Sequence, residues 1–299
     1  MNIVCRIDKT DHFEITEQAT YIDFFNPHSF SYTFWDNHNK LPYWYSQQSL
    51  DLLYLSLSVF AADRLSLRNE TVDGWSRKLI IYIPVLEYEL WEKAKSILEK
   101  MLCFLSGDKW TFVFRKRTQT ENEKVNYRKL EKSKQESKDY DQLCMFSGGL
   151  DSFIGAIDLL EGDKKRTLFV SHYGGGKGTK EFQDILKEKF IEYYSLEGRD
   201  FHQYFAKVVS GVEDTTRTRS FMFFSHAIAV ASCFRKPINV IIPENGFISL
   251  NIPSTFSRLG TSSTRTTHPY YMALFQELLE IIEIPVKLVN PYQFKTKGE

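Results

Sequence analysis

The segment Ser147–Ser152, which reads SGGLDS, limits the possible folds of this chain more than any other feature. It follows the apolar run Leu143–Phe146, which predicts a buried strand, and it leads into Leu150–Leu160, whose apolar spacing predicts a helix. The adjacent glycines Gly148 and Gly149 allow the backbone to turn tightly and bring its N–H groups against a phosphate, which a Cβ would obstruct. A phosphate-binding loop between a strand and a helix is therefore expected here.

The polar side chains of this loop fit the same interpretation. The hydroxyls of Ser147 and Ser152 add hydrogen-bond donors, and the positive end of the following helix favours an anion. Asp151 would repel a phosphate unless a cation lay between them, so we assign it to Mg²⁺ or to holding the loop. The alternative is a structural Gly-Gly turn with an Asp/Ser helix cap, which accounts only partly for the two serines. The expected nucleotide-binding residues are Ser147, Gly148, Gly149, Leu150, Asp151 and Ser152.

Strands and helices alternate through the second half of the chain, which predicts an α/β fold with a mostly parallel sheet covered on both faces. The expected strands are Leu143–Phe146, Thr167–His172, Tyr204–Val209, Ile238–Pro243 and Val286–Val289. The expected helices are Leu150–Leu160, Lys180–Tyr194, Phe221–Phe234 and Tyr270–Ile282. Ligands on such sheets bind outside the carboxyl ends of the strands, so functional residues are expected in the loops that follow them.

The first half has a different pattern and is predicted to be a separate α+β domain, residues 1–118. Its expected helices are Leu52–Leu65 and Glu87–Leu105, and its expected strands are Lys78–Val85 and Trp110–Arg115. Residues 119–140 carry alternating charges and almost no large aliphatic residues, which predicts a linker. The second domain then covers residues 141–299, and its end lacks a final packing element, which suggests a C-terminal truncation.

Composition excludes several classes of function. Lys plus Arg and Asp plus Glu both number 38, so no global charge favours nucleic acid or an anionic membrane. Met1–Asp11 has no apolar core of a secretory signal, which predicts a cytoplasmic protein. The longest uncharged apolar stretch, Ser220–Phe234, is shorter than the roughly 20 residues that span a bilayer. The 4 cysteines are widely separated, so no zinc site is expected.

A second glycine-rich segment, Tyr173–Thr179, is not a Walker A loop, because Gly178 separates Lys177 from Thr179. Thr179 also stands where a dinucleotide fingerprint would need glycine. We interpret the segment as a flap after the second strand, with Lys177 available to the phosphates. A solvated loop without function explains the sequence equally well.

Further polar residues follow the later strands of the predicted sheet. Arg217 and Arg219 precede the buried helix, where arginine can hold a phosphate or carboxylate bidentately, although surface charges are the alternative. We assign Arg219 a catalytic role and Arg217 a role in substrate binding. Glu244 and Asn245 could bind a purine-like edge, or form an Asn-Gly turn. The long loop Asn251–His268 is interpreted as a substrate loop that offers Arg258, Arg265 and His268.

SGGLDS after an apolar strand resembles the PP-loop of the ATP pyrophosphatases with the adenine-nucleotide α-hydrolase-like (HUP) fold. Within that group Asp141–Tyr292 is similar to QueC, the 7-cyano-7-deazaguanine synthase, and most of all to the QueC-like proteins of phage-defence operons, the Qat type. The closer similarity lies in Ile242–Asn251, Arg258–Gly260 and Thr264–Pro269. Three features depart from QueC: the four-cysteine zinc site is missing, Glu244-Asn245-Gly246 replaces an Asp-Tyr-Ser-Gly signature, and the first half has no counterpart.

The resemblance implies ATP and Mg²⁺ as cofactors and a 7-deazapurine-type carboxylate as substrate. It implies adenylation with release of pyrophosphate, followed by formation of an amide or nitrile or by conjugation to an amine, in an anti-phage defence system. The extra first half suggests a macromolecular acceptor, such as a partner protein from the same operon, although it could serve only for stability or dimerisation. The alternatives are a tRNA-modifying adenylase, against which the neutral charge and scattered cysteines count, and a non-catalytic ATP-sensing subunit of a defence complex.

Overall fold

The computed structural model describes residues 1–71, 73–133, 138–162, 165–174, 178–215, 217–250 and 265–299. Its larger sheet contains β3 (Phe30–Tyr32), β6 (Gln142–Met145), β7 (Thr167–Tyr173), β8 (Phe201–Val208), β9 (Ile238–Ile241) and β10 (Val286–Val289). The strand order is β10-β9-β6-β7-β8-β3, and all neighbours pair in parallel except β3, which is antiparallel to β8. The expected mostly parallel sheet is confirmed.

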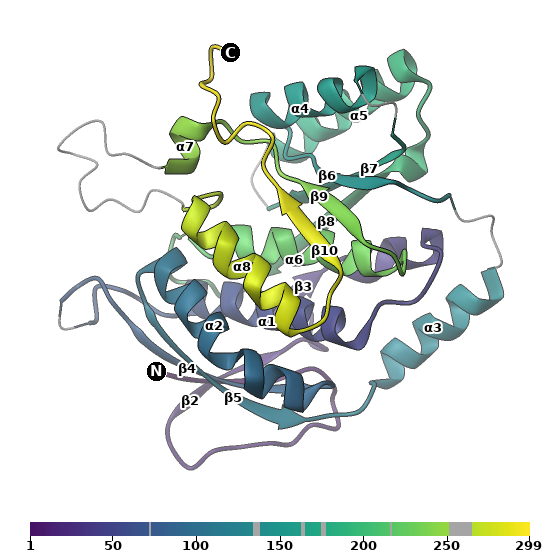
Figure 1. The fold of residues 1–299 in the computed structure, drawn as a ribbon. Coiled ribbons are helices and arrows are strands. Elements are labelled where there is room, and N and C mark those ends of the chain that lie inside the picture. The colour runs from purple at the N-terminus through teal and green to yellow at the C-terminus, as the bar shows by residue number, and fades with distance from the viewer. Residues whose placement is uncertain (72, 134–137, 163–164, 175–177, 216, 251–264) are drawn as a thin grey trace.

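Helices cover both faces of this sheet, as predicted. One face carries α4 (Leu150–Glu161) and α5 (Thr179–Tyr194), whereas α6 (Arg219–Ser232) and α8 (Pro269–Ile281) lie on the other (Figure 1). From β6 the chain adds β7 and β8 on one side and then returns to add β9 and β10 on the other. The chain therefore changes direction between β6 and β9, and ligands of open α/β sheets bind at such a switch point.

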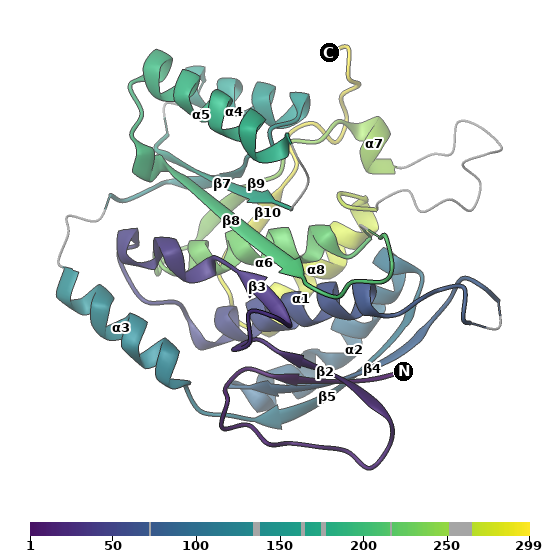
Figure 2. The ribbon, with the colours of Figure 1, turned by 180° about the vertical axis from the view of Figure 1, so that it is seen from behind.

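The first half forms a second sheet of β1 (Asn2–Arg6), β2 (Ala19–Asp23), β4 (Lys78–Val85) and β5 (Lys109–Lys116), in the order β2-β1-β4-β5. All its neighbouring strands are parallel, so the α+β description of this half is not confirmed. Two helices, α1 (Gln47–Leu65) and α2 (Tyr88–Ser106), lie between the two sheets, and the view from behind shows the same layers (Figure 2). α1 packs against α6, and α2 packs against α8.

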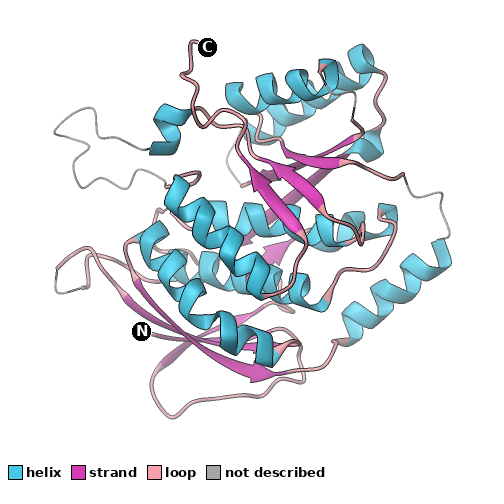
Figure 3. Cartoon of the chain, in the orientation of Figure 1, coloured by secondary structure: helices cyan, strands magenta, loops and turns pink. Residues whose placement is uncertain are grey.

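Most of the predicted linker is helical, as the secondary-structure colours of Figure 3 show for α3 (Glu121–Ser133). This helix packs against the 3₁₀ helix η1 (Phe34–Lys40) and buries Leu130. At its start, Thr120 accepts a hydrogen bond from the backbone N–H of Glu123, and the Glu123 carboxylate accepts one from the backbone N–H of Thr120. This reciprocal cap stabilises a helix whose charged sequence gave little apolar signal.

The two halves share their main hydrophobic core. The core includes Ile81, Trp91 and Leu98 from the first half, and Phe221 and Phe275 from the second. A smaller core lies between the sheet and the helix pair α4 and α5. Among the described residues, no helix has both the length and the apolar character needed to cross a membrane. Whether residues 1–118 and 141–299 are independent domains stays a prediction.

Candidate functional site

The SGGLDS loop lies where expected, between the carboxyl end of β6 and the first residue of α4. Gly148 has a φ of 87°, in the left-handed region that favours glycine. The Ser147 hydroxyl donates to Ser152 Oγ at 3.1 Å, and the Ser152 hydroxyl donates to the Gly149 carbonyl at 2.9 Å. The two serines that the sequence marked therefore hold the loop in shape. Ser147, Gly149 and Leu150 remain exposed at the amino end of α4, where an anion is favoured.

Gln183 on α5 holds this loop in place through a hydrogen bond, and the sequence analysis did not identify it. Its side chain is fully buried, and its amide nitrogen donates to the carbonyls of Ser147 at 3.0 Å and His172 at 3.2 Å. A Cβ at Gly148 would lie 3.1 Å from Gln183 Cγ, so the loop and this side chain fit only with glycine. A lone glutamine in an amphipathic helix gives no functional signal, because its burial depends on the tertiary packing.

Asp151 connects the loop to the segment that follows β9, across the switch point. One oxygen of its carboxylate accepts hydrogen bonds from the backbone N–H of Asn245 at 3.1 Å and from the Asn245 side-chain amide at 2.7 Å. The side-chain amide oxygen of Asn245, Oδ1, accepts a hydrogen bond from the N–H of Ile248 in the short helix α7 (Gly246–Leu250) at 3.1 Å. Asp151 thus ties the first turn of α4 to the segment after β9, and Asn245 organises the turn there.

Glu244 lies beside this pair and is partly buried. Burial raises the pKa of its carboxyl, a hydrogen bond from the Thr267 hydroxyl opposes the shift, and the charge of Asp151 adds to it. Two like charges at one site disfavour full ionisation, and a divalent cation near both would relieve the repulsion. Mg²⁺ prefers such oxygen ligands, but the described residues contain no group of three or more His, Cys, Asp or Glu side chains that could hold a metal ion.

The two candidate arginines have different surroundings. Arg217 is buried, donates to the Ser106 carbonyl at 2.9 Å, and has its guanidinium 4.2 Å from the Trp75 ring centroid. It therefore contacts the first half of the chain. Arg219, the first residue of α6, is partly buried and makes no hydrogen bond or ion pair with any residue that the structure describes. Burial lowers the pKa of its guanidinium.

Arg265 and His268 contact the first half rather than the loop. Arg265 donates to the Phe104 carbonyl at 2.5 Å and lies over the Phe104 ring. His268 accepts a hydrogen bond from the N–H of Tyr270 at 3.1 Å, which caps α8, and its ring centroid lies 4.9 Å from that of Phe104. The remaining two candidates, Lys177 and Arg258, lie outside the described residues, and all of these assignments stay predictions.

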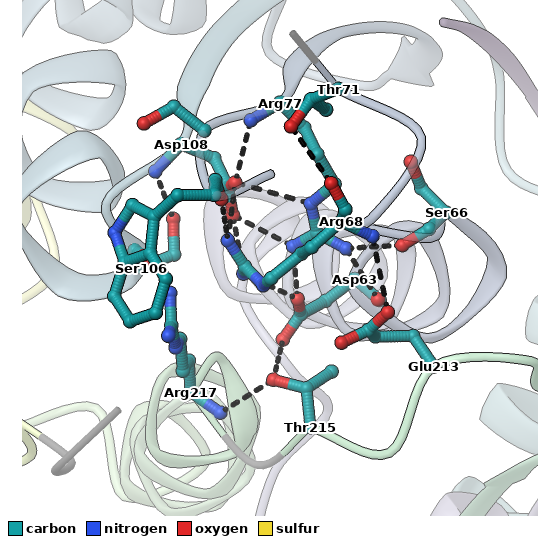
Figure 4. Close-up of polar contacts among 12 residues, drawn as sticks. Asp63, Ser66, Arg68, Thr71, Arg77, Ser106, Asp108, Glu213, Thr215 and Arg217 are labelled. Carbon is teal, nitrogen blue, oxygen red and sulfur yellow. Dashed lines mark hydrogen bonds and ion pairs between the residues drawn. The ribbon is translucent and has the colours of Figure 1, made fainter. Parts of the chain in front are cut away.

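A buried ion cluster anchors the segment before α6 to the first half (Figure 4). Arg77 donates to Asp108 at 2.7 Å and also to Asp63, while Arg68 donates to Asp108 at 2.7 Å and to Asp63 at 3.2 Å. Thr215, from the second half, donates to Asp63 at 3.2 Å. Burial alone would raise the pKa of Asp108, but hydrogen bonds from Arg77 and Arg68 hold it below its usual value. The Asp108 carboxylate therefore stays ionised and paired with both arginines.

No family model, curated protein or solved structure matches this chain. The assignment of function therefore depends on the geometry at the switch point and on the sequence resemblance described above.

Proposed function

We propose that this chain is a QueC-like PP-loop ATP pyrophosphatase that adenylates the carboxylate of a 7-deazapurine-type acid. The observation that carries the proposal is that a loop suited to phosphates and two carboxylates lie together at the switch point of the larger sheet. The exposed glycine and serine loop at the amino end of α4 suits the phosphates, and Asp151 in the first turn of α4 binds Asn245 after β9, which brings its carboxylate near that of Glu244. A HUP-type fold is part of this proposal.

The chemistry follows from the weakness of a carboxylate as an electrophile. The substrate carboxylate oxygen attacks the α-phosphorus of ATP, the bond from that phosphorus to the bridging oxygen breaks, and pyrophosphate leaves. An amine nitrogen then attacks the acyl carbon, AMP departs with the carbon–oxygen bond electrons, and the amine loses a proton. Mg²⁺, when bound, would supply positive charge for the leaving pyrophosphate.

The chain's own residues would bind and orient the reactants. The loop N–H groups, with the exposed Ser147, would hold the departing phosphates while Ser152 keeps the loop in shape, which is electrostatic stabilisation rather than acid–base catalysis. Asp151 and Glu244 would hold the cation. Arg219 has no other partner among the described residues, so it is free to bind the α-phosphate or the carboxylate.

The acceptor amine is proposed to belong to a partner protein. Arg265 and His268, at the end of the predicted substrate loop, contact Phe104 of α2, so the first half of the chain borders the region where an acceptor would enter. Ammonia as the acceptor is the simpler alternative, and the two differ in their products.

The test is incubation with ATP, Mg²⁺, 7-carboxy-7-deazaguanine and candidate partner proteins, with pyrophosphate and AMP measured and all products weighed by mass spectrometry. We expect pyrophosphate release, loss of it in Asp151→Asn, and normal release in Asp214→Asn, because Asp214 is fully exposed and distant from the loop in sequence. Asparagine can still accept the bonds from Asn245, so melting should stay within a few degrees.

Each outcome of this assay has a clear meaning. A mass added to a partner supports the protein acceptor, whereas free amide or nitrile with unchanged partners identifies ammonia. ATP binding without pyrophosphate release under any condition would favour the ATP-sensing alternative. Normal turnover by Asp151→Asn would remove the loop from the mechanism.

A further inference from the structure

Two buried histidines, His172 on β7 and His226 on α6, have no role in the proposed mechanism. His172, near the carboxyl end of β7, is 2% exposed, and neither ring nitrogen has a hydrogen-bond partner among the described residues. His226, on α6, is fully buried, and its ring centroid lies 6.0 Å from that of His172. Buried polar groups are normally hydrogen-bonded, so two unpartnered nitrogens on one ring need an explanation.

The tautomer of His226 follows from its one hydrogen bond. Its Nδ1 lies 2.7 Å from the Met222 carbonyl, and a carbonyl can only accept, so Nδ1 carries the proton. Burial lowers the pKa of His226 to about 4, and its Nε2 is therefore an unprotonated acceptor. His226 cannot donate to a ligand, so a donor role at this position falls to His172.

The geometry of α6 places Arg219 on the same side as this pair. Residues 219, 223 and 226 are spaced by four and three, so their side chains share one helix face. His172 faces that side, since its ring centroid lies 6.0 Å from those of both Phe223 and His226. Arg219 is close enough for its charge to act on His172, whose pKa is lowered by burial, by His226 and by Arg219.

The amino end of α6 already has an anionic partner, the Asp63 carboxylate, which accepts a hydrogen bond from the backbone N–H of Thr218 at 3.4 Å. Its N-cap residue, Thr218, makes no capping hydrogen bond, because its hydroxyl donates to Asp63 at 3.0 Å instead. The charge of Asp63 is in turn shared with Arg68 and Arg77. Arg219, the next residue, has no such partner among the described residues, so an unpaired guanidinium and the unpartnered imidazole of His172 lie on the same side of α6.

We propose that His172 and Arg219 form an oxyanion site, which takes a phosphate of the nucleotide or the carboxylate of the substrate. The proposal deepens the function proposed above and rests on it. Gln183 connects this site to the phosphate loop, because its amide nitrogen donates to the carbonyls of both Ser147 and His172. A neutral imidazole N–H and a guanidinium would both donate to the same anion, and donor bonds to charged groups are the stronger kind.

The competing explanation is that His172 only packs against Phe223 and His226. The variant His172→Phe distinguishes an oxyanion site from a packing role, because phenylalanine keeps an aromatic ring and removes both nitrogens. His202→Phe is the matched control, since His202 is 1% exposed but has a partner, with its Nδ1 3.2 Å from the Tyr204 hydroxyl. The probes are pyrophosphate, AMP and 7-carboxy-7-deazaguanine, each titrated calorimetrically with Mg²⁺ present, and each variant is first checked for a wild-type circular dichroism spectrum.

We expect His172→Phe to weaken binding of at least one probe by about tenfold or more, while His202→Phe binds all three as the wild type does. If only the binding of pyrophosphate or AMP is weakened, the site takes a phosphate. If only the binding of 7-carboxy-7-deazaguanine is weakened, the site takes the substrate carboxylate. Arg219→Gln, at the helix end, should weaken the same probe, and it serves as the test if His172→Phe does not fold. Unchanged binding of all three probes in a folded variant would overturn the proposal.

The result separates this site from the proposed reaction. Weakened phosphate binding in His172→Phe, with no pyrophosphate released by the wild type, would keep the oxyanion site and refute the adenylation. Pyrophosphate release with unaltered KM and kcat in both variants would keep the adenylation and refute the site.

Discussion

At the scale of single residues, burial decides the charge of three histidines. His172, His202 and His226 are all at most 2% exposed. Burial lowers the pKa of His202 to about 3 and that of His226 to about 4, so both are neutral near neutral pH. A buried neutral histidine makes stability depend on pH, because the unfolded chain binds a proton that the folded chain refuses.

His202 gives a direct test of this linkage. Its folded pKa is depressed, so the wild type loses stability as pH falls from the unfolded value of about 6.5 towards the folded value of about 3. In His202→Phe the unfolded chain has no imidazole at this position to protonate. The free energy of unfolding of the variant, relative to that of the wild type, should therefore rise by about 1.4 kcal/mol for each pH unit below about 6.5. Urea unfolding at about pH 7 and about pH 5 should show a relative gain of roughly 2 kcal/mol. A stability difference independent of pH would contradict the neutral state assigned to His202.

At the scale of elements, α4 positions the loop and depends on a glycine to do so. A Cβ at Gly155 would lie 2.4 Å from Pro243 Cγ, so the helix packs directly against the segment that carries Glu244. Glycine in a helix costs about 1 kcal/mol relative to alanine. Its presence here is explained by the close approach of α4 to the residues after β9.

Gly155→Ala should therefore destabilise the protein although alanine favours helices. Overpacking typically costs about 1–3 kcal/mol, which exceeds the gain in helix propensity of about 1 kcal/mol. Because α4 would move away from Pro243, ATP binding should weaken as well. Gly198→Ala is the control, since nothing lies within 4 Å of the added Cβ and its stability should be unchanged. A more stable Gly155→Ala with normal ATP affinity would show that α4 is not fixed by this contact.

The elements of the second half could be predicted because their signals are local. The strand Val286–Val289 was predicted with its observed bounds, and the predicted helix Leu150–Leu160 differs from α4 by one residue at its end. The charged helix α3 was missed because it buries few apolar residues, Leu130 among them. The strand Phe30–Tyr32 was missed because three residues give no period, and only pairing with β8 makes them a strand.

The candidate site was predictable to the extent that it is continuous in sequence. The SGGLDS loop and the residues after β9 could be placed at one sheet edge because the alternation of strands and helices predicts a parallel sheet. The contacts of Gln183, His172 and Arg217 could not, because each depends on which distant segment packs against it. Arg217 and Arg219 are two residues apart and each follows a threonine, so the sequence does not distinguish them, yet they lie in different surroundings.

At the scale of the whole molecule, the first half is part of the support for the second. β3 completes the edge of the larger sheet beside β8, and α1 and α2 cover the faces of α6 and α8 that point away from it. The cluster of Asp63, Arg68, Arg77 and Asp108 adds buried ion pairs at the same junction. Removing one partner of such a pair costs about 3–5 kcal/mol, because it leaves a buried charge uncompensated.

This packing predicts that residues 119–299 cannot fold alone, although the sequence suggests a separate domain from residue 141. Without the first half, the core residues Phe221, Phe224, Phe275 and Leu278 would lose their cover and become exposed. The fragment should show no cooperative thermal transition and should bind a hydrophobic dye, whereas the full chain melts in one transition. Co-expression with residues 1–118 should restore folding and ATP binding. Cooperative melting and ATP binding by the fragment alone would establish residues 141–299 as an independent domain and limit the first half to a later role, such as recognition of the acceptor.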